Sequence, residues 1–67
     1  MKYWLNVPGA QQRTRLLIDM GASIADGDVC VMINQTGGWT LCRWPHTPNE
    51  TGWEYGGRVM ETDVYWD

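Results

Sequence analysis

Apolar residues form two short runs near the middle of the chain, one on each side of a glycine-containing turn. VCVMI at 29–33 is largely β-branched, and WTLCRW at 39–44 follows it. Two such runs that flank a turn rich in Asn and Gly are typical of a β-hairpin. We therefore predict two antiparallel strands that are joined by a loop from Asn34 to Gly38.

A regular alternation of apolar and polar residues follows between residues 58 and 66. Successive side chains of a strand point to opposite faces of a sheet. One face is then predicted to carry Met60, Val64 and Trp66, and the other to carry Val59, Glu61, Asp63 and Tyr65. We expect the first face to belong to the core and the second face to be acidic and aromatic.

The N-terminal third contains a short strand and a segment with two interpretations. KYWLN at 2–6 is a predicted strand that ends before Pro8-Gly9, because proline lacks the N–H that a strand partner needs. Residues 10–20 contain good helix formers, and Gly21 suits the end of a helix. The same residues also alternate as a strand does, with apolar side chains at every second position near Ile18. We adopt helix as the prediction for residues 10–20.

The predicted order of strand, helix, strand, strand, strand indicates an α+β domain. In this fold a small antiparallel sheet of about four strands carries one helix near the N-terminus. The alternative is an all-β barrel of the SH3-like or OB-like kind, in which residues 13–24 form a strand and Asp26-Gly27 a hairpin turn. Either fold uses residues 1–67 as a single domain, since a chain of this length buries only about 60% of its unfolded surface.

Charge and hydropathy exclude two classes of partner. The chain has 5 Lys and Arg against 8 Asp and Glu, a net charge of −3. Duplex nucleic acids are bound largely through clustered cations, so generic nucleic-acid binding is disfavoured. No window approaches the roughly 20 apolar residues of a membrane span, and the N-terminus lacks the features of a signal peptide. The sequence therefore predicts a cytoplasmic protein with no membrane partner.

Cys30 and Cys42 are the only cysteines of the chain. A five-residue loop from Asn34 to Gly38 places them opposite each other, where a disulfide is geometrically accessible after some adjustment. A two-residue turn would instead place Cys30 opposite Pro45. Cytoplasmic thiols stay reduced, and free cysteine is among the most buried residue types. We therefore interpret both cysteines as reduced thiols of the core.

We predict no cofactor, metal site or catalytic residue. A zinc site needs three or four ligands, and the two cysteines with His46 fall short of that number. Glu61 and Asp63 lie close together, but no cleft is predicted that would separate their pKa values for acid and base catalysis. Gly37-Gly38 and Gly56-Gly57 match no phosphate-binding motif, and we interpret them as turn or bulge glycines. The protein is therefore not expected to be an enzyme.

The chain has 5 Trp and 3 Tyr but no Phe, and Trp, Tyr and Arg are the residues most enriched at binding hot spots. Several of them bracket the Pro- and Gly-rich loop at 45–52, and loops on a rigid sheet often carry binding residues. The predicted binding residues are Arg43, Trp44, Trp53, Tyr55, Arg58, Glu61 and Asp63. The competing interpretation is that the aromatic side chains only cover the end of a thin core.

Two functions fit this set of residues. In the first, the protein docks on a larger protein and modulates or inhibits it, with Glu61, Asp63 and Asp67 facing a basic patch. Its small size would suit an accessory protein of a phage or mobile element that acts on a host factor. In the second, an oligomeric protein binds a nucleotide or a sugar, whose phosphate would contact Arg43 and Arg58. A homodimer is compatible with both functions, because an exposed edge strand favours pairing.

Overall fold

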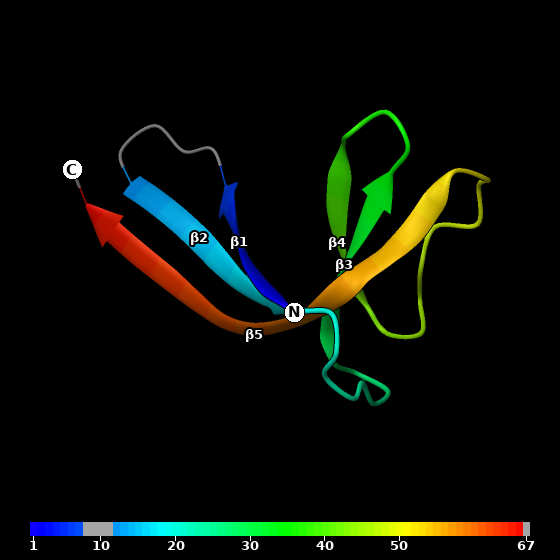
Figure 1. Cartoon of the computed structure of the whole chain (residues 1–67), viewed down its shortest axis with the longest axis horizontal. Coiled ribbons are helices and arrows are strands. Elements are labelled where there is room, and N and C mark those ends of the chain that lie inside the picture. Colours follow the sequence, from blue (N-terminus) through cyan, green and yellow to red (C-terminus); the bar gives the residue numbers. More distant parts are fainter. Residues whose placement is uncertain (8–11, 67) are drawn as a thin grey trace.

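The described part of the chain forms one antiparallel sheet of five strands (Figure 1). The computed structural model describes residues 1–7 and 12–66, and for residues 12, 65 and 66 it describes only the backbone. The strands are β1 (Lys2–Val7), β2 (Gln12–Asp19), β3 (Val29–Asn34), β4 (Trp39–Arg43) and β5 (Trp53–Trp66). These ranges contain no helix, so the predicted α+β fold is wrong and the all-β alternative has the correct fold class.

The last strand in the sequence is the central strand of the sheet. The strand order is β1-β2-β5-β3-β4, and β5 pairs with β2 through residues 58–66 and with β3 through residues 53–58. We call β1, β2 and residues 58–66 the first wing, and β3, β4 and residues 53–58 the second wing. Figure 1 shows the two wings diverging from a bend in the middle of β5. In the described residues no pairing joins the edge strands β1 and β4, so pairing does not close the sheet into a barrel.

The segment predicted as a helix is strand β2 over residues 12–19. Residues 8–11, which include the start of that prediction and the predicted end of the first strand, lie outside the described residues. β2 has a hydrogen-bonded neighbour on each side, β1 and β5, and its alternating residues Leu16 and Ile18 are buried. Helix propensities differ by less than about 1 kcal/mol per ordinary residue, so pairing and burial outweigh them here.

The connection from β2 to β3 differs from both predictions. Gly21 does not end a helix, and its N–H donates to Asp19 Oδ1 at 2.9 Å in a turn. Asp26-Gly27 also lies in a turn, with φ of 93° at Gly27. However, the described residues of β2 and β3 pair with β5 and not with each other, so this turn does not form the hairpin of the all-β alternative.

Two consecutive glycines allow the core to reach the backbone of β5 where the wings meet. A Cβ atom at Gly57 would lie 2.6 Å from Ile18 Cγ2, and a Cβ atom at Gly56 would lie 2.8 Å from Ile33 Cδ1 and 2.9 Å from Val31 Cγ1. Gly57 also has a φ of 131°, a conformation that residues with a side chain rarely adopt. Side chains from both wings therefore occupy the space that these glycines leave.

The same glycines form a β-bulge between β3 and β5. The register passes from Val31 opposite Gly57 to Met32 opposite Tyr55, which leaves Gly56 as the extra residue. A bulge of this kind bends a strand and increases its twist. The interpretation of Gly56-Gly57 as bulge glycines is therefore confirmed, and the bulge explains the bend of β5.

A second irregularity shifts the faces of β5. Leu17 lies opposite Glu61, whereas Ile18 lies opposite Val59, so Met60 is the extra residue. Val59 consequently packs against the core, and its predicted place on the acidic face with Glu61 is wrong. Met60 is 42% exposed, so the predicted assignment of this residue to the core is also wrong.

The core is small and lies where the wings meet. Its buried residues are Leu16, Ile18 and Val31, with Tyr3, Leu5, Val7, Trp39 and Val59 packed against them. The Tyr3 hydroxyl donates to the Gly56 carbonyl oxygen at 2.6 Å and ties β1 to the bend. Val64, which was predicted in the core, is 51% exposed in the outer part of the first wing.

We predict that Gly57→Ala destabilises the protein by about 2 kcal/mol or more, through its positive φ and its overlap with Ile18. Urea denaturation monitored by tryptophan fluorescence measures this change. Gly38→Ala is the matched control, because a Cβ atom there has no neighbour within 4 Å, and we expect less than about 0.5 kcal/mol. Equal stability of Gly57→Ala and the unmodified protein would contradict the role given to this glycine.

Candidate functional site

The β3–β4 hairpin has the register that the five-residue loop predicts. Cys30 lies opposite Cys42, and the Asn34 N–H closes the loop by donating to the Gly38 carbonyl oxygen at 2.7 Å. The sequence left two registers open, and the structure has the one with the five-residue loop. Both cysteines are free thiols, with Cys30 buried and Cys42 partly buried.

The environment of Cys30 opposes reactivity. Burial, together with the nearby Cys42 thiol, raises the pKa of Cys30. The thiolate is the reactive form of cysteine, so a raised pKa keeps this side chain neutral and inert near pH 7. Cys30 therefore contributes to packing on the face of β3 that also carries the buried Met32.

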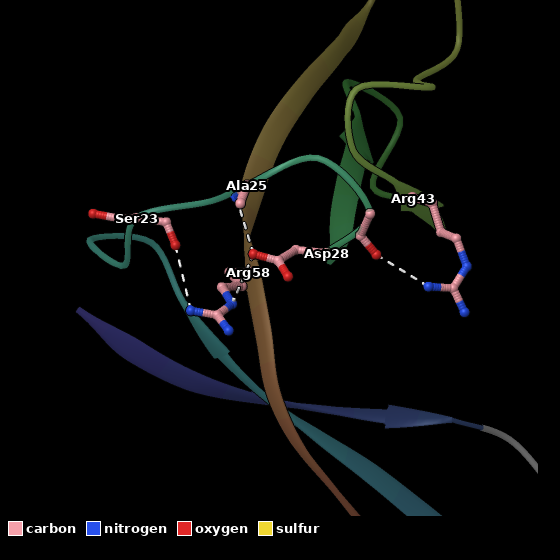
Figure 2. A network of polar contacts seen from close by, with 6 residues as sticks. Ser23, Ala25, Asp28, Arg43 and Arg58 are labelled. Carbon is pink, nitrogen blue, oxygen red and sulfur yellow. Dashed lines mark hydrogen bonds and ion pairs between the residues drawn. The ribbon is translucent and has the colours of Figure 1, made fainter.

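Arg43 and Arg58, which were predicted to bind a ligand, contact the loop before β3 (Figure 2). Arg43 Nη1 donates to the Gly27 carbonyl oxygen at 3.0 Å. Arg58 Nη1 donates to the Ser23 carbonyl oxygen at 3.4 Å, and its Nε lies 3.5 Å from Asp28 Oδ2. These contacts hold the 20–28 loop against the second wing.

The predicted aromatic residues of the second wing pack on one another. The rings of Trp44 and Tyr55 meet edge to face, with centroids 5.7 Å apart and planes at 71°. Trp53 is partly buried and lies opposite Asn34. The Tyr55 hydroxyl is buried without a hydrogen-bond partner in the described residues, and burial, followed by the nearby Cys30, raises its pKa. This geometry resembles the cover of a thin core more closely than a presented binding surface.

Glu61 and Asp63 lie in the first wing, away from the Trp44–Tyr55 pair. Asp63 Oδ2 accepts hydrogen bonds from Arg15 Nε at 3.3 Å and Arg15 Nη2 at 3.2 Å. Glu61 is exposed. The structure therefore divides the predicted binding residues between two wings, while Asp67 lies outside the described residues.

An exposed cluster that the sequence analysis missed lies on the first wing. The Arg15 guanidinium carbon lies 4.1 Å from the centroid of the Trp4 ring, and the same guanidinium binds Asp63. The Trp4 side chain is 41% exposed, and Arg15 and Asp63 are 41% and 42% exposed. An indole, a guanidinium and a carboxylate thus meet across the three adjacent strands β1, β2 and β5.

The feature of the sequence that could have revealed this cluster is the alternation of polar and apolar residues at 12–19. If this segment is a strand, Arg15 falls on the face opposite Leu16 and Ile18, together with every second residue of the neighbouring strands. Asn6 and Asp63 are its direct partners in the register, and Trp4 is a diagonal neighbour. The helix prediction concealed this arrangement.

The described residues contain neither a candidate metal site nor a candidate membrane-spanning helix. Within residues 1–7 and 12–66, no group of three or more His, Cys, Asp and Glu side chains is placed to hold a metal ion. The same residues contain no helix that is long and apolar enough to span a bilayer.

Comparisons with known proteins do not assign the chain to a family. Family models, curated protein sequences and solved structures all gave no match. The evidence for function is therefore the geometry of the described residues.

We predict opposite effects for two tyrosine hydroxyls. Tyr3→Phe removes a hydrogen bond to Gly56 and should cost about 1 kcal/mol. Tyr55→Phe removes a buried hydroxyl without a described partner, so stability should stay unchanged or rise. Urea denaturation of both variants tests this pair, and an equal loss in the two would show that the Tyr55 hydroxyl has a partner.

Alkaline pH should destabilise the fold. Burial is the main cause that raises the pKa values of Cys30, Tyr3 and Tyr55 above their ordinary values of 9.0 for Cys and 10.0 for Tyr. The unfolded chain loses these protons at a lower pH than the folded protein does, so the folded state loses stability as the pH rises from the ordinary pKa values toward the raised ones. Unfolding free energies measured from pH 7 upward should decline above about pH 9, and a constant value would contradict the expected shifts.

Proposed function

We propose that the protein is a non-catalytic binding protein that holds a sugar on the exposed face of the first wing. The observation that supports this proposal is the cluster of Trp4, Arg15 and Asp63, in which a partly exposed indole adjoins a guanidinium and a carboxylate. The Arg15 guanidinium covers one face of the Trp4 ring, so the apolar face of a sugar would stack on the other face of the indole. Sugar hydroxyls both donate and accept hydrogen bonds, so they can bind a carboxylate and a guanidinium side by side.

The charges of the cluster favour a sugar over a nucleotide. A phosphate beside Arg15 would also face the Asp63 carboxylate, whose oxygen lies 3.2 Å from the guanidinium, in a chain with a net charge of −3. Arg43 and Arg58, the residues predicted to hold a phosphate, instead contact backbone carbonyls and Asp28. A neutral ligand avoids both difficulties.

Docking on a larger protein is the second candidate function. It is favoured by the outer half of β5, where the exposed Glu61 follows Met60, which is 42% exposed. An acidic side chain next to an exposed apolar one would suit a basic patch with an apolar centre, and charge complementarity would speed association. Both candidates assume the cytoplasmic location that the sequence predicts.

We predict that Trp4→Ala weakens sugar binding by about 5- to 150-fold, because stacking on an aromatic ring contributes about 1–3 kcal/mol for nucleic-acid bases. The measurement is a titration with soluble mono- and oligosaccharides, followed by NMR shifts of the indole N–H groups. Glu61→Gln is the control on the same strand as Asp63, and it should bind as the unmodified protein does.

Two outcomes would contradict the sugar proposal. One is the absence of shifts with every saccharide tested, and the other is unchanged binding by Trp4→Ala. Protein docking would then be tested with Glu61→Lys, which should slow association with a basic partner most strongly at low salt.

A further inference from the structure

Strand β4 has an unpaired edge whose hydrogen-bonding groups can be assigned. The Asn34 N–H donates to Gly38 O at 2.7 Å, and the Trp44 N–H donates to Asp28 O at 2.8 Å, at opposite ends of the β3–β4 pair. Hydrogen-bonded and non-hydrogen-bonded pairs alternate along antiparallel strands. Both ends give the same phase, so residues 40 and 42 face β3, and the N–H and C=O groups of residues 39, 41 and 43 point away from it. One of these outward groups, the Arg43 carbonyl oxygen, accepts the His46 N–H at 2.7 Å.

Nothing in the β4 sequence opposes pairing with another strand. Natural proteins protect edge strands with charged side chains, especially lysine, with proline or with bulges. β4 consists of Trp, Thr, Leu, Cys and Arg, its register with β3 is regular, and its only charged residue, Arg43, donates to Gly27 O. Its central residue Leu41 is 44% exposed, so an apolar side chain at the middle of this edge strand is presented to solvent.

The other free edges carry lysine or acidic side chains, which natural proteins use to protect edge strands. β1 begins with the exposed Lys2. The outer half of β5 has no partner on the side away from β2 in the described residues, and it carries Glu61 and Asp63. In antiparallel pairings of two such strands centred on residue 61, 62 or 63, acidic side chains lie directly opposite each other, which is destabilising. β4 is therefore the edge best suited to a second copy of the chain.

We propose that two copies of the protein dimerise by antiparallel pairing of β4 with β4, with a two-fold axis at Leu41. This register pairs Leu41 with Leu41 of the second copy, and Trp39 with Arg43 of the second copy. The outward N–H groups of all three residues and the outward C=O groups of Trp39 and Leu41 then take part, whereas the Arg43 carbonyl oxygen already accepts the His46 N–H at 2.7 Å. The register places no like charges opposite each other.

The small core explains why a second copy stabilises the fold. Among the described residues, five apolar side chains are buried, and only Ile18, Val31 and Cys30 are fully enclosed. Both cysteines are free thiols, and proteins of this size often depend on disulfides, metals or oligomerisation for stability. Pairing at β4 buries Leu41 and joins the two five-stranded sheets into one. The inference does not depend on sugar binding, because β4 lies in the second wing.

Light scattering coupled to size-exclusion chromatography, over a concentration series, tests the dimer. The unmodified protein is expected at twice its 7.7 kDa mass. Leu41→Lys should be a monomer, since it places two lysines opposite each other at the axis. Val64→Lys, which changes an exposed apolar residue of β5, is the matched control and should remain a dimer. Circular dichroism verifies that both variants fold.

Amide hydrogen exchange of the unmodified protein provides a second measurement that needs no variant. Exchange at Trp39, Leu41 and Arg43 should slow as protein concentration rises, because only the dimer engages these amides. A monomer at every concentration would overturn the proposal. Exchange at these three amides that does not depend on protein concentration would also overturn it. The same holds for a dimer that is dissociated by Val64→Lys but not by Leu41→Lys.

Discussion

The close approach of core side chains to the backbone at Gly56-Gly57 is the constraint on which the rest of the structure depends. Ile18 from the first wing and Ile33 and Val31 from the second occupy the positions that side chains at these two residues would need. The bulge at the same place bends β5, so one strand can serve both wings. The Tyr3 hydroxyl then links β1 to the carbonyl of Gly56. The small core is therefore organised around two residues that have no side chain.

This arrangement also determines which polar residues remain available for function. Arg58 follows the bend directly, and together with Arg43 it holds the 20–28 loop through carbonyl oxygens and Asp28. The aromatic side chains near the 45–52 loop pack over the second wing. The outward face of the first wing presents Trp4 and Arg15 beside Asp63. Candidate binding chemistry is therefore found at a distance from the loop where the sequence places it.

Local patterns predicted the parts of the fold that depend on local chemistry. The β3–β4 hairpin was predicted, although its register was left open between a five-residue and a two-residue turn, and consecutive glycines indicated the bulge. The error at residues 12–19 arose because helix propensity is local, whereas the stability of β2 comes from β1 and from a strand some 45 residues later. The bulge at Met60 depends on the same distant pairing, so the alternation alone misplaced Val59. The cluster at Trp4 could be predicted only from the register of three strands.

The position of β5, last in sequence and central in the sheet, has a consequence for folding on the ribosome. Before β5 is synthesised, the described strands can form only two separate hairpins, β1 with β2 and β3 with β4. Isolated two-stranded hairpins are marginally stable in water. Tyr3 must also wait for Gly56, 53 residues further on, and contacts of such long range slow folding. The nascent chain therefore cannot form the five-stranded sheet until β5 has emerged from the ribosome.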